Sequence, residues 1–152
     1  MYANILVAVD GSEASKYAVN EAIQIARLSG GKLTAVYVLD QSAAFTYAGA
    51  CDPHLLTDTA RQVGRGFLDK ACAKMQKFAV TGDSEIIETQ GIGEDVATCL
   101  ARCAAQFRAD LVVMGTHGRR GMRRMVIGSV AERFVRQSTC PVLLIREAWT
   151  GA

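Results

Sequence analysis

The chain has 152 residues, of which 50% are hydrophobic and 21% charged, so we expect one compact domain spanning residues 1–152 and exclude a disordered chain. Seventeen Lys and Arg against fifteen Asp and Glu leave a charge of +2, too little for a protein that coats nucleic acid by bulk charge. With no apolar run of roughly 18–20 residues, no secretory pattern and an odd number of cysteines, the sequence predicts a cytoplasmic protein with reduced thiols and no membrane span.

The N-terminal part of the chain predicts a βαβ unit. Residues 4–9 form a nearly continuous apolar run, typical of a strand buried on both faces of a parallel sheet. Asp10-Gly11-Ser12 then supplies a turn and a helix N-cap, and apolar residues recur at helical spacing from Ala14 until Ser29-Gly30-Gly31. Residues 32–39 are the second predicted strand.

The middle of the chain predicts a loop and then a long helix. Residues 41–53 show no clear period, whereas residues 56–78 carry apolar side chains at helical spacing. Gly64 and Gly66 lie inside this helix, and each weakens it by about 1 kcal/mol relative to alanine.

The remaining elements continue the alternation of strands and helices. After a turn at residues 81–83, the pattern predicts strand 85–89, helix 96–107, strand 111–114, helix 129–137 and strand 142–145. Strands that alternate with helices predict an α/β domain with a single doubly wound, Rossmann-like parallel sheet and helices on both faces.

Two strand ends carry unusual residues. In doubly wound sheets, ligands bind beyond the carboxyl ends of the strands, where the winding reverses. The first strand leads into Asp10, and the fourth leads into Gly115-Thr116-His117-Gly118. If these two strands are neighbours, their loops line one crevice.

The loop after the fourth strand has the features of a phosphate site. Gly115, Gly118 and Gly121 lack Cβ atoms, so main-chain N–H groups can approach an anion. Gly128-Ser129 opens a helix whose N-terminus is electropositive. Four cations lie between these points, at Arg119, Arg120, Arg123 and Arg124.

Each of these features also has a purely structural alternative. Ser129 and Glu132 have the spacing of a capping box, so Ser129 could simply cap its helix. Asp10 could cap the first helix, the glycines could only shape a loop, and an arginine cluster is usually a solvated face. The coincidence of all the features at one sheet edge favours phosphate binding.

The glycine pattern of this loop, together with the first and last predicted strands, resembles the nucleotide-binding branch of the universal stress proteins. That branch carries Gly-x2-Gly-x9-Gly-Ser/Thr after its fourth strand, and Gly115, Gly118, Gly128 and Ser129 match the pattern. The opening Ile-Leu-Val-Ala-Val-Asp-Gly-Ser and the closing Cys-Pro-Val-Leu-Leu-Ile are similar to the family's first and last strands. The resemblance covers essentially the whole chain.

The resemblance implies a strand order of 3-2-1-4-5 and ATP bound in the crevice, with Mg²⁺ or Mn²⁺ bridging phosphate oxygens. Asp10 would lie near the nucleoside, and main-chain groups around Val38 would contact adenine. The full set of predicted nucleotide-binding residues is Asp10, Ser12, Val38, Gly115, Thr116, Gly118, Arg119, Gly128, Ser129 and Val130.

The same resemblance implies a nucleotide-dependent stress-response or signalling module that acts on an unidentified protein partner. No general base is evident in the loop, so we expect little or no ATP hydrolysis. The alternative is a slow ATPase or a nucleotidyl-transferring enzyme of the same fold. The last strand, Val142 to Ile145, would be a sheet edge through which the family forms homodimers.

Overall fold

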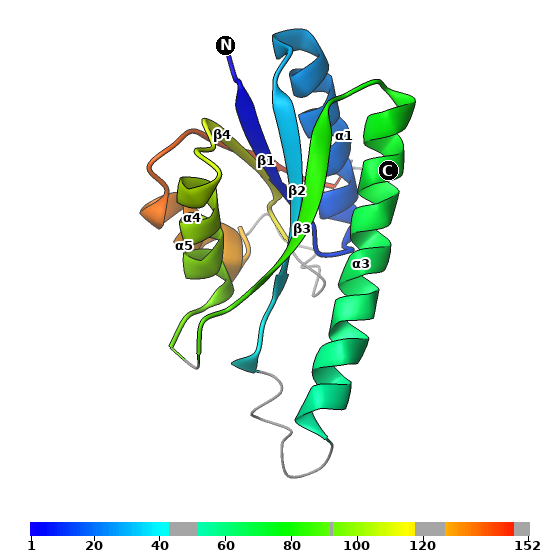
Figure 1. Ribbon diagram of the computed structural model, residues 1–152. Coiled ribbons are helices and arrows are strands. Elements are labelled where there is room, and N and C mark those ends of the chain that lie inside the picture. Colours follow the sequence, from blue (N-terminus) through cyan, green and yellow to red (C-terminus); the bar gives the residue numbers. More distant parts are fainter. Residues whose placement is uncertain (43–51, 92, 118–126, 148–152) are drawn as a thin grey trace, which may run out of the picture.

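A computed structural model describes residues 1–42, 52–91, 93–117 and 127–147, and within these ranges five strands alternate with four helices (Figure 1). The strands are β1 (Asn4–Ala8), β2 (Lys32–Leu39), β3 (Gly82–Glu88), β4 (Leu111–Gly115) and β5 (Val142–Ile145). The helices are α1 (Glu13–Ser29), α3 (Pro53–Lys77), α4 (Val96–Gln106) and α5 (Ser129–Gln137).

The strands form one parallel sheet in the order β3-β2-β1-β4-β5. Helices α1 and α3 cover one face, and α4 and α5 cover the other (Figure 1). The predicted doubly wound α/β fold and its strand order are therefore confirmed. Because β1 and β4 are parallel, the loops that follow them leave the same edge of the sheet, and because the strands are neighbours, these loops begin side by side.

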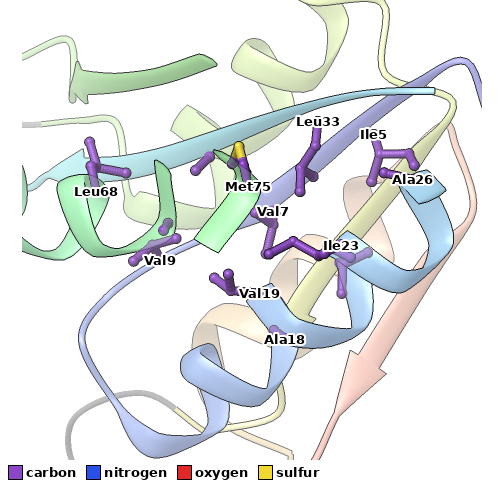
Figure 2. Packing of buried hydrophobic residues seen from close by; sticks show 14 of the residues in the cluster. Ile5, Val7, Val9, Ala18, Val19, Ile23, Ala26, Leu33, Leu68 and Met75 are labelled. Carbon is purple, nitrogen blue, oxygen red and sulfur yellow. The ribbon is translucent and has the colours of Figure 1, made fainter. Parts of the chain in front are cut away.

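Consecutive residues of a strand point to opposite faces of the sheet. In the central strands both sets of residues are apolar, because helices cover both faces. Ile5 and Val7 of β1 pack against the α1 and α3 side (Figure 2), whereas Leu6 between them packs against the α4 and α5 side. All three are at most 1% exposed. This double burial explains why β1 is a continuous apolar run rather than an alternating one.

Two predicted boundaries are wrong. Residues 81–83 do not form a turn, because β3 begins at Gly82, where a Cβ would overlap the Leu33 carbonyl oxygen of β2 and lie 2.7 Å from the Met75 sulfur. The glycine thus marks a close approach inside the sheet. Helix α3 begins at Pro53, earlier than predicted, because the Asp52 side chain accepts a hydrogen bond from the His54 amide and caps it.

None of the helices in the described ranges is both long enough and apolar enough to cross a membrane.

Candidate functional site

The turn after β1 is fixed by its own polar side chains. Asp10 Oδ1 accepts a hydrogen bond from the Ser12 amide at 2.9 Å. Ser12 Oγ accepts one from the Ser15 amide at 3.2 Å and is the N-cap of α1. The cap of this helix is therefore Ser12, and the alternative that Asp10 caps it is wrong.

Gly115, the last residue of β4, lets α1 approach the sheet. A Cβ at this position would lie 2.8 Å from the Ala14 Cβ, closer than real Cβ contacts, and 3.1 Å from the Ser15 nitrogen, which is tighter than most. The start of α1 therefore packs directly on the end of β4. Across this contact Ser12 Oγ donates a hydrogen bond to the His117 carbonyl at 3.4 Å, which joins the two loops.

Thr116 and Gly128 hold the start of α5 against the end of β4. Thr116 is buried, and its amide donates a hydrogen bond to the Ile145 carbonyl at 2.9 Å. Its carbonyl oxygen accepts a hydrogen bond from the Gly128 amide at 2.7 Å. A Cβ on Gly128 would lie 2.9 Å from the Thr116 carbonyl oxygen. The Gly128 amide is therefore already hydrogen-bonded within the fold.

Among the residues that the structure describes, no side chain caps the N-terminus of α5. Its N-cap is Gly128, and the first intrahelical bond runs from the Glu132 amide to the Gly128 carbonyl at 2.9 Å. Ser129 is the first helical residue and is exposed, so its predicted capping box does not form. The other helices of the described ranges are capped by side chains, from Ser12, Asp52 and Asp95. Within the described ranges no side chain accepts from the first amides of α5, which are the groups through which a helix start binds an anion.

His117 contributes an unsatisfied ring nitrogen beside this helix start. Its Nδ1 lies 3.0 Å from Thr116 Oγ1, whereas its buried Nε2 has no hydrogen-bond partner among the residues that the structure describes. A buried polar atom without a partner is uncommon in folded proteins.

The main chain of Val38 projects beyond the paired part of β1. The register of β1 with β2 stops at Ala8↔Val36, and the Val9 amide donates to the Val36 carbonyl at 2.8 Å. Alternate residues of a strand direct their N–H and C=O groups to the same neighbour. The Val38 amide and carbonyl therefore face the β1 side, past its last paired residue.

Eight of the ten predicted site residues are thus placed along the carboxyl edge of β2, β1 and β4 or at the start of α5. Ser12, Gly115, Thr116 and Gly128 are linked by direct contacts or through the residues beside them. Gly118 and Arg119 lie outside the described residues, as do Gly121 and the other three arginines of the loop.

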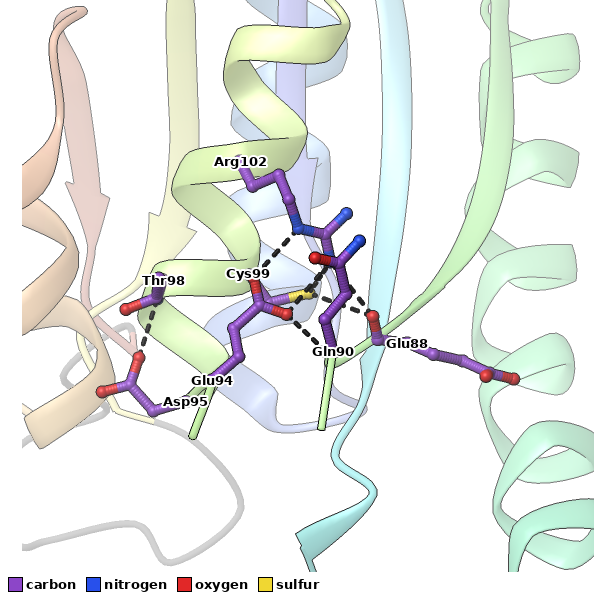
Figure 3. A network of polar contacts seen from close by, with 7 residues as sticks. All are labelled: Glu88, Gln90, Glu94, Asp95, Thr98, Cys99 and Arg102. Carbon is purple, nitrogen blue, oxygen red and sulfur yellow. Dashed lines mark hydrogen bonds and ion pairs between the residues drawn. The ribbon is translucent and has the colours of Figure 1, made fainter. Parts of the chain in front are cut away.

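A polar network that the sequence patterns did not predict lies at the neighbouring edge, between β3 and α4 (Figure 3). Arg102 binds Glu94 through both carboxylate oxygens, at 2.9 and 3.1 Å, and this hydrogen bonding lowers the pKa of Glu94. The Asp95 carboxylate caps α4 by accepting a hydrogen bond from the Thr98 amide at 2.8 Å, and this bond lowers the pKa of Asp95. An Asp just before an apolar helical run is an N-cap signal, so this cap could have been predicted.

A cavity of about 660 Å³ lies elsewhere, between α3 and β3. Its lining includes Arg61, Arg65 and Ser84, and it contains none of the predicted site residues. Its size does not identify a binding site, because the chemically distinctive groups gather at the ends of β1 and β4.

Comparisons with known proteins agree with the fold described above. Residues 1–146 match the model of the Universal stress protein family. Universal stress protein MJ0531 of Methanocaldococcus jannaschii is 31% identical over 147 residues, which cover 97% of this chain and 84% of that protein. A crystal structure of a family member from Burkholderia pseudomallei is 39% identical, with a TM-score of 0.78, and covers 95% of this chain and 96% of its own.

More distant structures share the fold and were determined with adenine nucleotides. A universal stress protein of Archaeoglobus fulgidus in complex with dAMP is 22% identical, has a TM-score of 0.67 and covers 95% of this chain and 98% of its own. One from Arabidopsis thaliana with AMP bound is 19% identical, has a TM-score of 0.66 and covers 97% of this chain and 93% of its own. The family match over nearly the whole chain and the shared sheet order lead to one conclusion: this chain belongs to the universal stress protein family.

Proposed function

We propose that this protein binds ATP in the crevice beyond β1 and β4 and acts in the cytoplasm as a nucleotide-dependent stress-response or signalling module. The observation that carries the proposal is the N-terminus of α5, which no side chain of the described residues caps and which the 2.7 Å bond between Gly128 and Thr116 holds beside the end of β4. Helix N-termini bind phosphate through free amides and the helix dipole. The dAMP and AMP complexes of fold relatives support an adenine nucleotide as the occupant.

The proposed roles follow the shape of the crevice. The amides of Ser129 and Val130 and the Ser129 hydroxyl would donate to phosphate oxygens, together with Gly118 and Arg119 of the loop. Gly115 and Gly128 act indirectly, because their missing side chains let α1 and α5 close on β4. Thr116 would be an adjacent polar neighbour.

The nucleoside end would lie toward β1 and β2. Asp10 would accept a sugar hydroxyl or approach a bound cation, and Ser12 lies beside it. The Val38 main chain would meet adenine. Mg²⁺ or Mn²⁺ would bridge phosphate oxygens and neutralise part of their charge, which is the chemistry such ions supply to nucleotides.

We further propose that the protein forms a homodimer through β5. This strand is an edge of the sheet, and its four residues, Val142–Ile145, are only partly buried. An apolar edge with unpaired main-chain groups recruits a second strand unless it is covered. A second copy of the chain offers the same edge by symmetry.

The test is calorimetry with ATP and Mg²⁺ on the wild type, Gly118→Val and a control, Gly93→Val. Gly93 is exposed, and a Cβ there meets no atom within 4 Å. We expect saturable binding to the wild type and to Gly93→Val, and a loss of at least about tenfold for Gly118→Val. Equal binding by all three would remove the site from this loop. Sustained release of phosphate or pyrophosphate over many turnovers would instead support the enzyme alternative.

A further inference from the structure

Glu88 is the last residue of the edge strand β3 and is paired in register with Leu39 at the end of β2. It therefore lies at the carboxyl edge of the sheet, one strand from the main-chain groups of Val38. Its carbonyl and its carboxylate point in opposite directions, the carbonyl toward α4 and the side chain toward α3 (Figure 3). The residue thus joins elements on both faces of the sheet.

On the α4 side, the Glu88 carbonyl accepts a hydrogen bond from Arg102 Nη2 at 3.1 Å and a weaker one from the Cys99 thiol at 3.7 Å. Arg102 is in turn held by both oxygens of Glu94, whose side chain is only 11% exposed. Bidentate carboxylate–guanidinium pairs are geometrically specific. The end of β3 is therefore fixed to α4.

On the other side, the Glu88 carboxylate forms an ion pair with Arg61 of α3 and accepts a hydrogen bond from Gln41 Nε2 at 2.8 Å. Two further bonds bind the same segments: the Gln41 amide donates to Thr89 Oγ1 at 3.0 Å, and the Thr89 amide donates to the Leu39 carbonyl at 3.0 Å. The chain directly after Val38 is thus attached to the end of β3 at three points.

We propose that Glu88 is a positioning residue that holds the end of β2 in the geometry needed to recognise a base of the adenine type. This inference rests on the proposed function. The Val38 N–H and C=O lie on one side of the strand and present a donor next to an acceptor. Adenine offers the complementary acceptor at N1 and donor at N6, whereas guanine offers N1–H and O6, which are reversed.

Such recognition depends on a fixed main chain. A shift of about 1 Å in a positioning group is enough to weaken a binding geometry strongly. Losing the Glu88 carboxylate releases the side chains of Gln41 and Arg61 together. The two bonds through Thr89 and the pairing of β2 with β3 further back in the sheet remain. The effect should therefore concentrate on the base and leave the phosphate end at α5 unchanged.

The experiment compares calorimetric affinities for ATP and GTP, each with Mg²⁺, for the wild type, Glu88→Gln and Gln41→Ala. Asp83→Asn is the matched control, because Asp83 is an ion-paired carboxylate at the opposite end of the same strand, bonded to Lys32 at 2.6 Å. We expect the wild type to prefer ATP. Both test variants should lose about tenfold in ATP affinity with little change for GTP, and Asp83→Asn should behave as the wild type. Urea unfolding confirms that each variant is folded.

The outcomes separate the two proposals. A wild type that binds neither nucleotide contradicts the proposed function. A wild type that binds ATP and GTP equally, or variants that keep the wild-type ratio of the two affinities, overturns the positioning role of Glu88 while leaving nucleotide binding intact. A parallel loss of both affinities also overturns it, because it indicates a general structural effect.

Discussion

The hydroxyl of Ser12 donates a hydrogen bond to the carbonyl of His117 at 3.4 Å, across a sequence separation of 105 residues. Ser12 follows β1 and caps α1, and His117 follows β4. The contact exists because the two strands are neighbours and because Gly115 lets α1 approach β4. It brings the turn after β1 and the residues directly after β4 to one place, which is the geometry that a nucleotide spanning both would need.

Two glycines of α3 should respond oppositely to alanine. A Cβ on Gly64 would lie 2.6 Å from Cε1 of the buried Tyr37, whereas a Cβ on the exposed Gly66 meets no atom within 4 Å. Gly64→Ala should lower the free energy of unfolding by about 1–3 kcal/mol through overpacking. Gly66→Ala should raise it by about 0.5–1 kcal/mol through helix propensity. Urea unfolding measures both, and effects of the same sign would show that Tyr37 does not limit this position.

The Glu94–Arg102 pair should make stability depend on pH. Hydrogen bonding from Arg102 holds the pKa of Glu94 below its ordinary value, so its contribution is fully present above about pH 4.3, the unfolded value, and is lost as the pH falls through the lower folded value. At neutral pH, Glu94→Gln should cost about 1–3 kcal/mol, because Arg102 loses its charged partner.

This cost should shrink as the pH falls through the lowered pKa of Glu94, because the wild-type carboxyl then becomes protonated too. The control is Glu132→Gln, since Glu132 pairs with Arg136 at 2.9 Å but its side chain is 55% exposed. That variant should change the unfolding free energy by under about 1 kcal/mol at any pH. A Glu94→Gln cost that stays constant from neutral to acidic pH would contradict the assignment.

Proline at an outward-facing position of β5 should prevent the proposed dimer. The Pro141 and Ile145 carbonyls accept hydrogen bonds from β4, so by alternation the amide of Leu144 faces away from the sheet. Leu144→Pro removes that donor without removing a bond to β4, and Leu144→Ala controls for the shortened side chain. Sedimentation velocity should give a dimer for the wild type and for Leu144→Ala, and a monomer for Leu144→Pro. A dimer in all three would place the interface elsewhere.

The fold could be predicted from sequence because each strand and helix carries its own pattern of apolar residues. The apolar run of β1 and the one-sided spacing of α4 each identify an element without reference to the rest of the chain. Gly82 misled the prediction because glycine indicates either a turn or a close approach between strands. Only the proximity of Leu33 and Met75 distinguishes the two.

The glycine motif predicts a site at the ends of β1 and β4, and that site stays a prediction. In the fold, the missing side chains of Gly115 and Gly128 serve main-chain packing, and the first amides of α5 belong to the residues that follow Gly128. The bonds from Glu88 to Arg102 and to Gln41 could not be predicted from sequence. The bonded residues are 14 and 47 positions apart, and only the strand order shows that they are neighbours in the fold.

The most direct test of the central claim places a carboxylate at the start of α5. Ser129→Asp should keep or raise the stability of the fold, because a negative charge suits a helix N-terminus, but it should repel phosphate from the same amides. Leu55→Asp is the matched control: it adds the same charge in the first turn of α3, at a side chain that is 62% exposed. In calorimetry with ATP and Mg²⁺, we predict wild-type affinity for Leu55→Asp and a loss of at least about tenfold for a folded Ser129→Asp. Unchanged ATP affinity in Ser129→Asp would contradict phosphate binding at this helix.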